Sequence, residues 1–330
     1  LRPVMTSLKA PSQRVKARSI SSSKKPPYTT DSIQQALEHQ STPRLLQEAA
    51  MLRILGNEKI SKPLARWVNS LPNSVIDRPP ASWAFTPIAS QFGTVHSNLD
   101  KVLDGFQPHE VADLAKEGIR EGEDVKTIED RHLQVIRHPK VTSMALKLSS
   151  FVPFEQLQSG IETPAYEKAV QILTKICREA QTLNKKIYID AEGVPEQRLI
   201  EKVQRQLGKE FNDTVYLTFQ SVRSDTLKNL EDYLNECTRQ GLTARIKQVK
   251  GAYHKKESQN YPQFYHQEFN DTDLAFRSAV AMTDQFQGSK NQFIGTMNPD
   301  LLMHFSQTLQ PSTYTFANLK GMEVAPAMGL

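Results

Sequence analysis

Apolar residues between about 141 and 330 alternate between short runs and longer, periodic stretches. The short runs are bounded by polar residues and turn residues, which is typical of strands. They predict strands at Ser143–Leu148, Lys186–Ile189, Val215–Phe219, Thr243–Val249, Gln292–Gly295 and Tyr314–Ala317.

The stretches between these runs repeat apolar residues every three or four positions, as an amphipathic helix does. The first such face holds Tyr166, Ala169, Val170, Leu173, Cys177 and Ala180. The second holds Leu199, Ile200, Val203, Leu207 and Phe211, and the third holds Leu227, Leu230, Leu234 and Cys237. Gly241 is the expected end of the third helix. One helix between successive strands predicts a parallel sheet.

The chain before residue 141 reads as mainly helical. Helices are predicted from Ser41, over 61–71 and over 108–120, and the segment around Arg78 is a loop. The polar stretch 120–135 gives no clear pattern. We therefore divide the chain into a tail (1–30), a helical region (31–140) and an α/β domain (141–330).

Polar residues follow nearly every predicted strand, which favours a barrel over a doubly wound sheet. They are Lys147, Asp190, Glu192, Gln220, Lys247, Lys250 and Asn298. A barrel gathers the carboxyl ends of its strands on one face, where its chemistry takes place. No Gly-x-Gly-x-x-Gly turn follows a strand, so the dinucleotide fingerprint of a Rossmann sheet is missing.

The net charge of +5 comes from the tail. Residues 1–30 carry seven Lys and Arg and no acid, whereas the other 300 residues hold 34 basic and 36 acidic groups. Such a tail, also rich in Ser, predicts a mitochondrial transit peptide, with a disordered basic tail as the alternative. The near-neutral remainder argues against nucleic-acid binding. We expect no membrane-spanning helix and no metal site, and we expect Cys177 and Cys237 to be buried free thiols.

The segment Ala244–Tyr253 carries the sharpest chemical pattern. Alternation along a strand places Arg245 and Lys247 on the same side, opposite to Ala244 and Ile246. Inside a barrel these cations require an anionic ligand or buried carboxylates. Gly251 and Ala252 would let the backbone approach a pyrophosphate. On the neighbouring strands, we expect Lys147 to form an ion pair with Asp190.

Several short segments occur in the order and approximate spacing of the proline dehydrogenase family, which the chain resembles over about 140–325. They are Lys147-Leu148-Ser149, Ile189-Asp190-Ala191-Glu192, Thr218-Phe219-Gln220, Val249-Lys250-Gly251-Ala252-Tyr253, Thr272-Asp273, Thr296-Met297-Asn298 and Phe316–Met322. The resemblance implies a distorted (β/α)8 TIM-like barrel that binds FAD.

The resemblance also implies a function: oxidation of L-proline to Δ1-pyrroline-5-carboxylate, with electrons passed to a quinone. The expected location is the matrix side of the mitochondrion, with peripheral inner-membrane association. It implies that Lys147, Asp190 and Tyr253 serve the substrate. It assigns FAD binding to Gln220, Lys247, Lys250, Gly251, Ala252, Thr296 and Asn298.

The chain departs from the family pattern at several positions. Met297 stands where the family has His, Val222 replaces an aromatic residue, and Asn318 and Lys320 replace Gln and Leu. The family's last strand and its Tyr-x-x-Arg-Arg helix are missing, so we expect a barrel that is open between its first and seventh strands. Two alternatives stay open: a non-catalytic relative, and another barrel enzyme that uses Lys250 or Lys147 as a Schiff-base amine.

Overall fold

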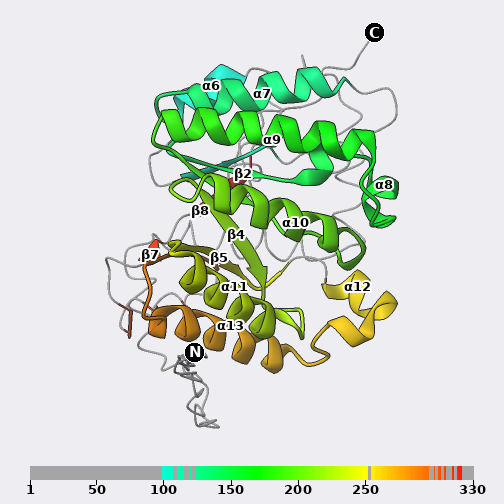
Figure 1. Ribbon diagram of the computed structural model, residues 1–330, viewed down its shortest axis with the longest axis vertical. Helices are drawn as coiled ribbons and strands as arrows, with labels where there is room; N and C mark the ends of the chain where they lie inside the picture. The colour runs from blue at the N-terminus through cyan, green and yellow to red at the C-terminus, as the bar shows by residue number, and fades with distance from the viewer. Residues whose placement is uncertain are drawn as a thin grey trace, which may run out of the picture.

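A computed structural model of the chain describes residues 99–106, 110–114, 119, 124–251 and 254–296, together with 301, 304–305, 308–309, 314–315 and 318–321. The predicted tail, the predicted helices from Ser41 and over 61–71, and the loop around Arg78 lie outside these residues. Within them, strands and helices alternate (Figure 1).

The strands are β1 (Glu110–Asp113), β2 (Ser143–Leu146), β3 (Lys186–Ile189), β4 (Val215–Gln220), β5 (Ala244–Val249), β6 (Lys290–Gly295), β7 (Tyr314–Thr315) and β8 (Asn318–Gly321). The helices are α6 (Leu99–Asp104), α7 (Val125–Arg137), α8 (Phe154–Gln158), α9 (Pro164–Thr182), α10 (Val194–Glu210), α11 (Thr226–Gln240), α12 (His254–Asn260) and α13 (Phe269–Gln285). Short 3₁₀ turns cover Leu148–Ser150 and Pro262–Phe264.

All strand pairs are parallel, in the order β7-β6-β5-β4-β3-β2-β1-β8. The sheet is strongly curved. The rings of Tyr188 on β3 and Phe293 on β6 have centroids 4.7 Å apart, although three strand spacings of a flat sheet would separate them by about 14 Å. The fold is therefore the expected α/β, TIM-like barrel arrangement.

One expectation about the sheet was wrong. The predicted helix over 108–120 contains the strand β1, so the sheet begins before residue 141. The expected opening of the barrel is present but lies between β7 and β8: β8 pairs with β1 and β7 with β6, and among the described residues no pairing joins β7 to β8. Thr315 and Asn318 are three residues apart, so the two ends of the sheet lie within about 11 Å of each other.

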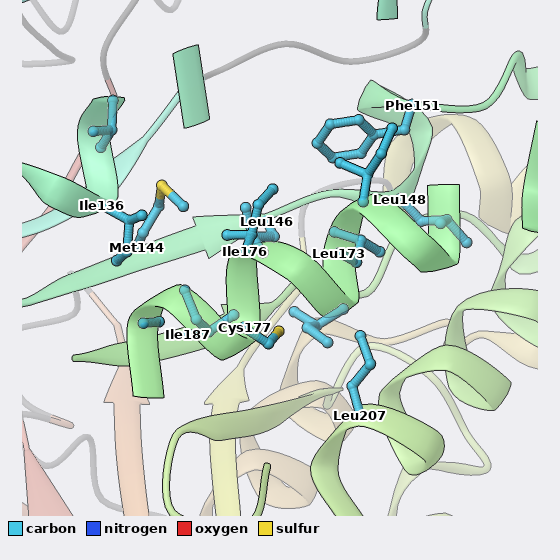
Figure 2. Packing of buried hydrophobic residues seen from close by; sticks show 14 of the residues in the cluster. Ile136, Met144, Leu146, Leu148, Phe151, Leu173, Ile176, Cys177, Ile187 and Leu207 are labelled. Atoms are coloured by element: carbon cyan, nitrogen blue, oxygen red, sulfur yellow. The ribbon is translucent and has the colours of Figure 1, made fainter. Parts of the chain in front are cut away.

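Helices α7, α9, α10, α11 and α13 cover the outside of the strands (Figure 1). Helix α9 begins where the Thr163 hydroxyl accepts a hydrogen bond from the Tyr166 amide, with Pro164 in the first turn. Its predicted apolar face packs against β2 and β3; Figure 2 shows Ile176 beside Leu146 of β2 and Cys177 beside Ile187 of β3. Gly241 ends α11 at a φ of +66°, as predicted. Both cysteines are buried and free.

Candidate active site at the carboxyl ends of the strands

Lys247 and Asp190 form an ion pair inside the barrel. The Lys247 ammonium donates to Asp190 Oδ1 at 2.5 Å, and the two side chains are 3% and 15% exposed. Lys247 lies near the end of β5 and Asp190 directly follows β3, so the pair joins strands that are not neighbours. Of the two alternatives for Lys247, an anionic ligand or a buried carboxylate, the structure supplies the carboxylate. Because both charges are largely shielded from water, breaking this pair on one side would be costly.

Lys147 lies beside Asp113, at the end of β1, with 3.7 Å between Nζ and Oδ2. We expected Asp190 to pair with Lys147, but the structure gives Asp190 a different cation, Lys247. Asp113 lies on the strand that is paired with β2, so it is close to Lys147 in any case, whereas the curvature of the sheet brings Lys247 of β5 toward Asp190 after β3. Two ion pairs therefore border this end: Lys147–Asp113 and Lys247–Asp190.

Gln220, the last residue of β4, links the end of β4 to the segment that follows β3. Its amide group donates to the backbone oxygen of Glu192, which follows β3, at 2.8 Å. Next to it, Gly251 has a φ of +114°, a conformation that favours glycine. A Cβ atom at Gly251 would lie 2.4 Å from Val222 Cγ1 and 3.0 Å from Gln220 Oε1. The Val222 and Gln220 side chains therefore occupy the space where a Cβ of Gly251 would lie, and the approach of a pyrophosphate to the Gly251 backbone stays a prediction.

Lys250, which follows β5, forms an ion pair with Asp273 on α13. Thr296 directly follows β6 and is half-buried. Three predicted site residues, Ala252, Tyr253 and Asn298, lie outside the described residues, as does Met297. The structure thus brings Lys147, Asp190, Gln220, Lys247, Lys250, Gly251 and Thr296 to one end of the barrel, and their proposed roles stay predictions.

A layer of apolar and aromatic side chains fills the barrel below this end. It consists of Val111, Ala145, Tyr188, Tyr216 and Phe293, one from each of five strands. Tyr188 packs against Tyr216 and Phe293, and Lys247 Nζ lies 5.8 Å from the centre of the Tyr188 ring. Burial, with a smaller contribution from Tyr216, raises the pKa of Tyr188, so its phenol is neutral. These rings form a floor beneath the two ion pairs.

Asp113 was not among the predicted site residues. The sequence did contain a pattern that could have identified it: Asp113 follows the apolar residues Val111 and Ala112, just as Asp190 follows the apolar strand that ends at Ile189. Asp273 belongs to the Thr272-Asp273 segment but was given no role. Among the described residues, no cluster of His, Cys, Asp and Glu has the geometry to hold a metal ion, and no helix is long and apolar enough to span a bilayer.

The solved structures most like this chain include two forms of proline utilization A. One, from Bdellovibrio bacteriovorus and inactivated by N-propargylglycine, matches with a TM-score of 0.67 and 13% identity over 89% of this chain. The other, a variant from Bradyrhizobium japonicum, matches with a TM-score of 0.61 and 16% identity over 76% of this chain. The aligned parts make up only 39% and 29% of those chains, and at such identities the likeness shows the fold alone.

No curated protein matches the chain by sequence. A family model, however, covers most of it: the model described as proline dehydrogenase matches residues 103–327. That span contains every strand that the structure describes, and it contains the Lys147–Asp113 and Lys247–Asp190 ion pairs. The chain therefore belongs to the proline dehydrogenase family.

Proposed function

We propose that this protein is a flavin-dependent dehydrogenase that oxidises L-proline to Δ1-pyrroline-5-carboxylate and passes the electrons to a quinone. Family membership supports the substrate. The observation that best supports an active site at this position is the buried Lys247–Asp190 ion pair. It lies over the Tyr188 ring at the carboxyl ends of the strands, where barrel enzymes have their active sites.

The residues at this end fit FAD. Gly251 supplies bare backbone with a positive φ, which suits close approach to a phosphate, and Lys250 lies next to it in the chain. Gln220 and Lys247 would contact the isoalloxazine ring, and Lys250, Gly251, Ala252, Thr296 and Asn298 would hold the rest of the nucleotide. When bound, FAD would accept a hydride from the substrate carbon next to nitrogen.

The protein's own contribution is to fix charge in place. Asp190 holds the Lys247 ammonium in a single position within the barrel, so the cation needs no rearrangement when negative charge develops nearby. Lys147, whose side chain is 14% exposed, is the cation that we assign to the substrate carboxylate, and Asp113 orients it. Tyr253 is assigned to the substrate ring.

The test is flavin binding and proline-dependent dye reduction by the purified full chain. We expect the protein to bind FAD, and we expect Lys247→Met to lower proline turnover about 100-fold or more, because a fixed cation is lost. Lys228→Met is the matched control, since Lys228 forms an exposed ion pair with Asp232 on α11. Proline turnover at the wild-type rate in the Lys247→Met protein would show that Lys247 has no role in catalysis.

One observation favours a second function, that of a non-catalytic relative. Each lysine that we place at the mouth already has a carboxylate partner: Lys147 has Asp113, Lys247 has Asp190 and Lys250 has Asp273. The site is therefore neutralised before any substrate arrives. Flavin binding without proline oxidation, or no flavin binding at all, would decide for this alternative.

The location of the protein is also a proposal. The seven cations and absent acids of residues 1–30 support import into the mitochondrial matrix, with peripheral association at the inner membrane. Deleting residues 1–30 should abolish import into isolated mitochondria and leave the unfolding midpoint unchanged. Import of the deleted protein at the wild-type level would contradict this assignment.

A further inference from the structure

Two cations lie inside the barrel at the end opposite to the candidate active site. Lys186 is the first residue of β3 and shares a face with Tyr188, and Arg245 is the second residue of β5 and shares a face with Lys247. Both approach the ring of Tyr216 on β4. Lys186 Nζ lies 6.0 Å and Arg245 Cζ 5.5 Å from its centre.

These cations are poorly neutralised. In the part of the chain that the structure describes, no carboxylate lies within ion-pair distance of Lys186. Arg245 has Asp213 at 4.0 Å, but that side chain is 85% exposed, and such pairs contribute little. Arg245 also donates to the Asn212 backbone oxygen and, at 3.3 Å, to the Tyr216 hydroxyl. Burial, followed by the charge of Arg245, lowers the pKa of Lys186.

The sequence pattern posed a choice for the cations of β5: a buried carboxylate or an anionic ligand. Lys247 has the carboxylate. Arg245 lies next to a second cation instead, and two partly desolvated like charges are stabilised by an anion between them. The rings of Tyr188, Tyr216 and Phe293 separate this end of the barrel from the mouth.

We propose that Lys186 and Arg245 form a binding site for a small oxyanion, with inorganic phosphate as its simplest ligand. The guanidinium group suits the oxygen pairs of an oxyanion, and the ammonium adds a second charge. The side chain of Arg245 is 16% exposed, which leaves the site open to solvent at the amino ends of the strands. This site is independent of proline oxidation.

The test is unfolding of the full chain in increasing phosphate, with NaCl adjusted to constant ionic strength. We expect the unfolding midpoint to rise by a few degrees and to saturate, because the ligand binds the native state. Lys186→Met and Arg245→Met should lose the rise. Lys209→Met, which removes the same charge from the exposed end of α10, should keep it.

A second measurement separates a ligand site from a structural role. Without phosphate, Lys186→Met should unfold at the same midpoint as the wild type or higher, because it removes a poorly neutralised charge. Phosphate ³¹P line broadening should be lost in Arg245→Met and also in the milder Arg245→Gln. The proposal is overturned if phosphate has no effect beyond that of NaCl, if Lys186→Met keeps the response, or if Lys186→Met is strongly destabilised without phosphate.

Discussion

His132 is buried on α7, where its Nδ1 donates to the backbone oxygen of Ile128 at 2.7 Å and its ring packs against Phe151. Burial lowers the pKa of His132 from 6.5 to about 4. The native protein therefore keeps this imidazole neutral at pH values where the unfolded chain takes up a proton.

The sign of the resulting pH dependence follows from linkage. Between pH 6.5 and 4 the unfolded state binds more protons at this position, so stability falls as the pH is lowered through this range, by about 3 kcal/mol. His132→Asn keeps an N–H donor but does not titrate. Urea unfolding of both proteins at several pH values should show the extra slope only in the wild type, and parallel curves would contradict the assignment.

Gly251 and Gly241 offer a matched pair of substitutions. Both have a positive φ, but a Cβ at Gly241 would meet nothing within 4 Å, whereas at Gly251 it would meet Val222. Gly241→Ala should cost about 1–2 kcal/mol from the backbone alone. Gly251→Ala should cost more, by about 1–3 kcal/mol for the overpacking. Val222→Ala added to Gly251→Ala should recover that difference in urea unfolding. Equal losses of unfolding free energy for the two Gly→Ala substitutions would show that the Val222 side chain can move away without a penalty.

At the scale of elements, α12 is fixed to α10 through one carboxylate. Glu257 of α12 accepts a hydrogen bond from the Val194 amide, at the start of α10, and another from the Tyr265 hydroxyl. Residues around Tyr265 also pair with the loop after β4: the Ser224 amide donates to the Phe264 oxygen and the His266 amide to the Val222 oxygen. The loops after β3, β4 and β5 thus form one unit beside the candidate active site.

Removing the shared carboxylate should loosen this unit. Glu257→Ala should cost about 1–2 kcal/mol, because the Val194 amide at the start of a helix loses its acceptor. Combined with Tyr265→Phe, the double-mutant cycle should give a coupling of about 1 kcal/mol. Glu231→Ala, at an exposed position on α11, is the control. Additive effects of the two substitutions would mean that the Tyr265 hydrogen bond contributes nothing.

The sequence pattern was sufficient for α9, α10, α11 and the central strands, but it did not identify α7, which lies in the polar stretch 120–135, or assign a face to α13. Every apolar residue that the sequence analysis assigned to the second helical face, now α10, is buried. Apolar residues that recur every three or four positions over seventeen residues form a single stripe, and this stripe can only face the core. The sequence pattern failed at β1, whose four residues are too few to show a period and follow Pro108, a common helix-start residue. The ion pair of Asp190 could not be predicted, because its partner depends on how far the sheet curves.

At the scale of the whole molecule, the C-terminal residues cover both ends of the sheet. A protein ending at residue 313 would lack β7 and β8 and leave one edge of β1 and one edge of β6 unpaired. We expect it to aggregate and to bind a hydrophobic dye, as judged by light scattering and fluorescence. A protein ending at Gly321 should behave like the full chain. A monomeric 1–313 protein with an unchanged unfolding midpoint would contradict the pairing of β8 with β1.

The pairing of β1 with β8 also determines how long β1 waits for its partner during synthesis of the chain. The chain has 204 residues between Asp113 and Asn318. At about 5–20 residues per second, β1 is synthesised roughly 10–40 s before its partner β8. During that interval one edge of a nascent sheet is available to other chains, which is the situation that chaperones relieve. The pairing of β8 with β1 is thus a late step in the folding of this protein, however early its central strands assemble.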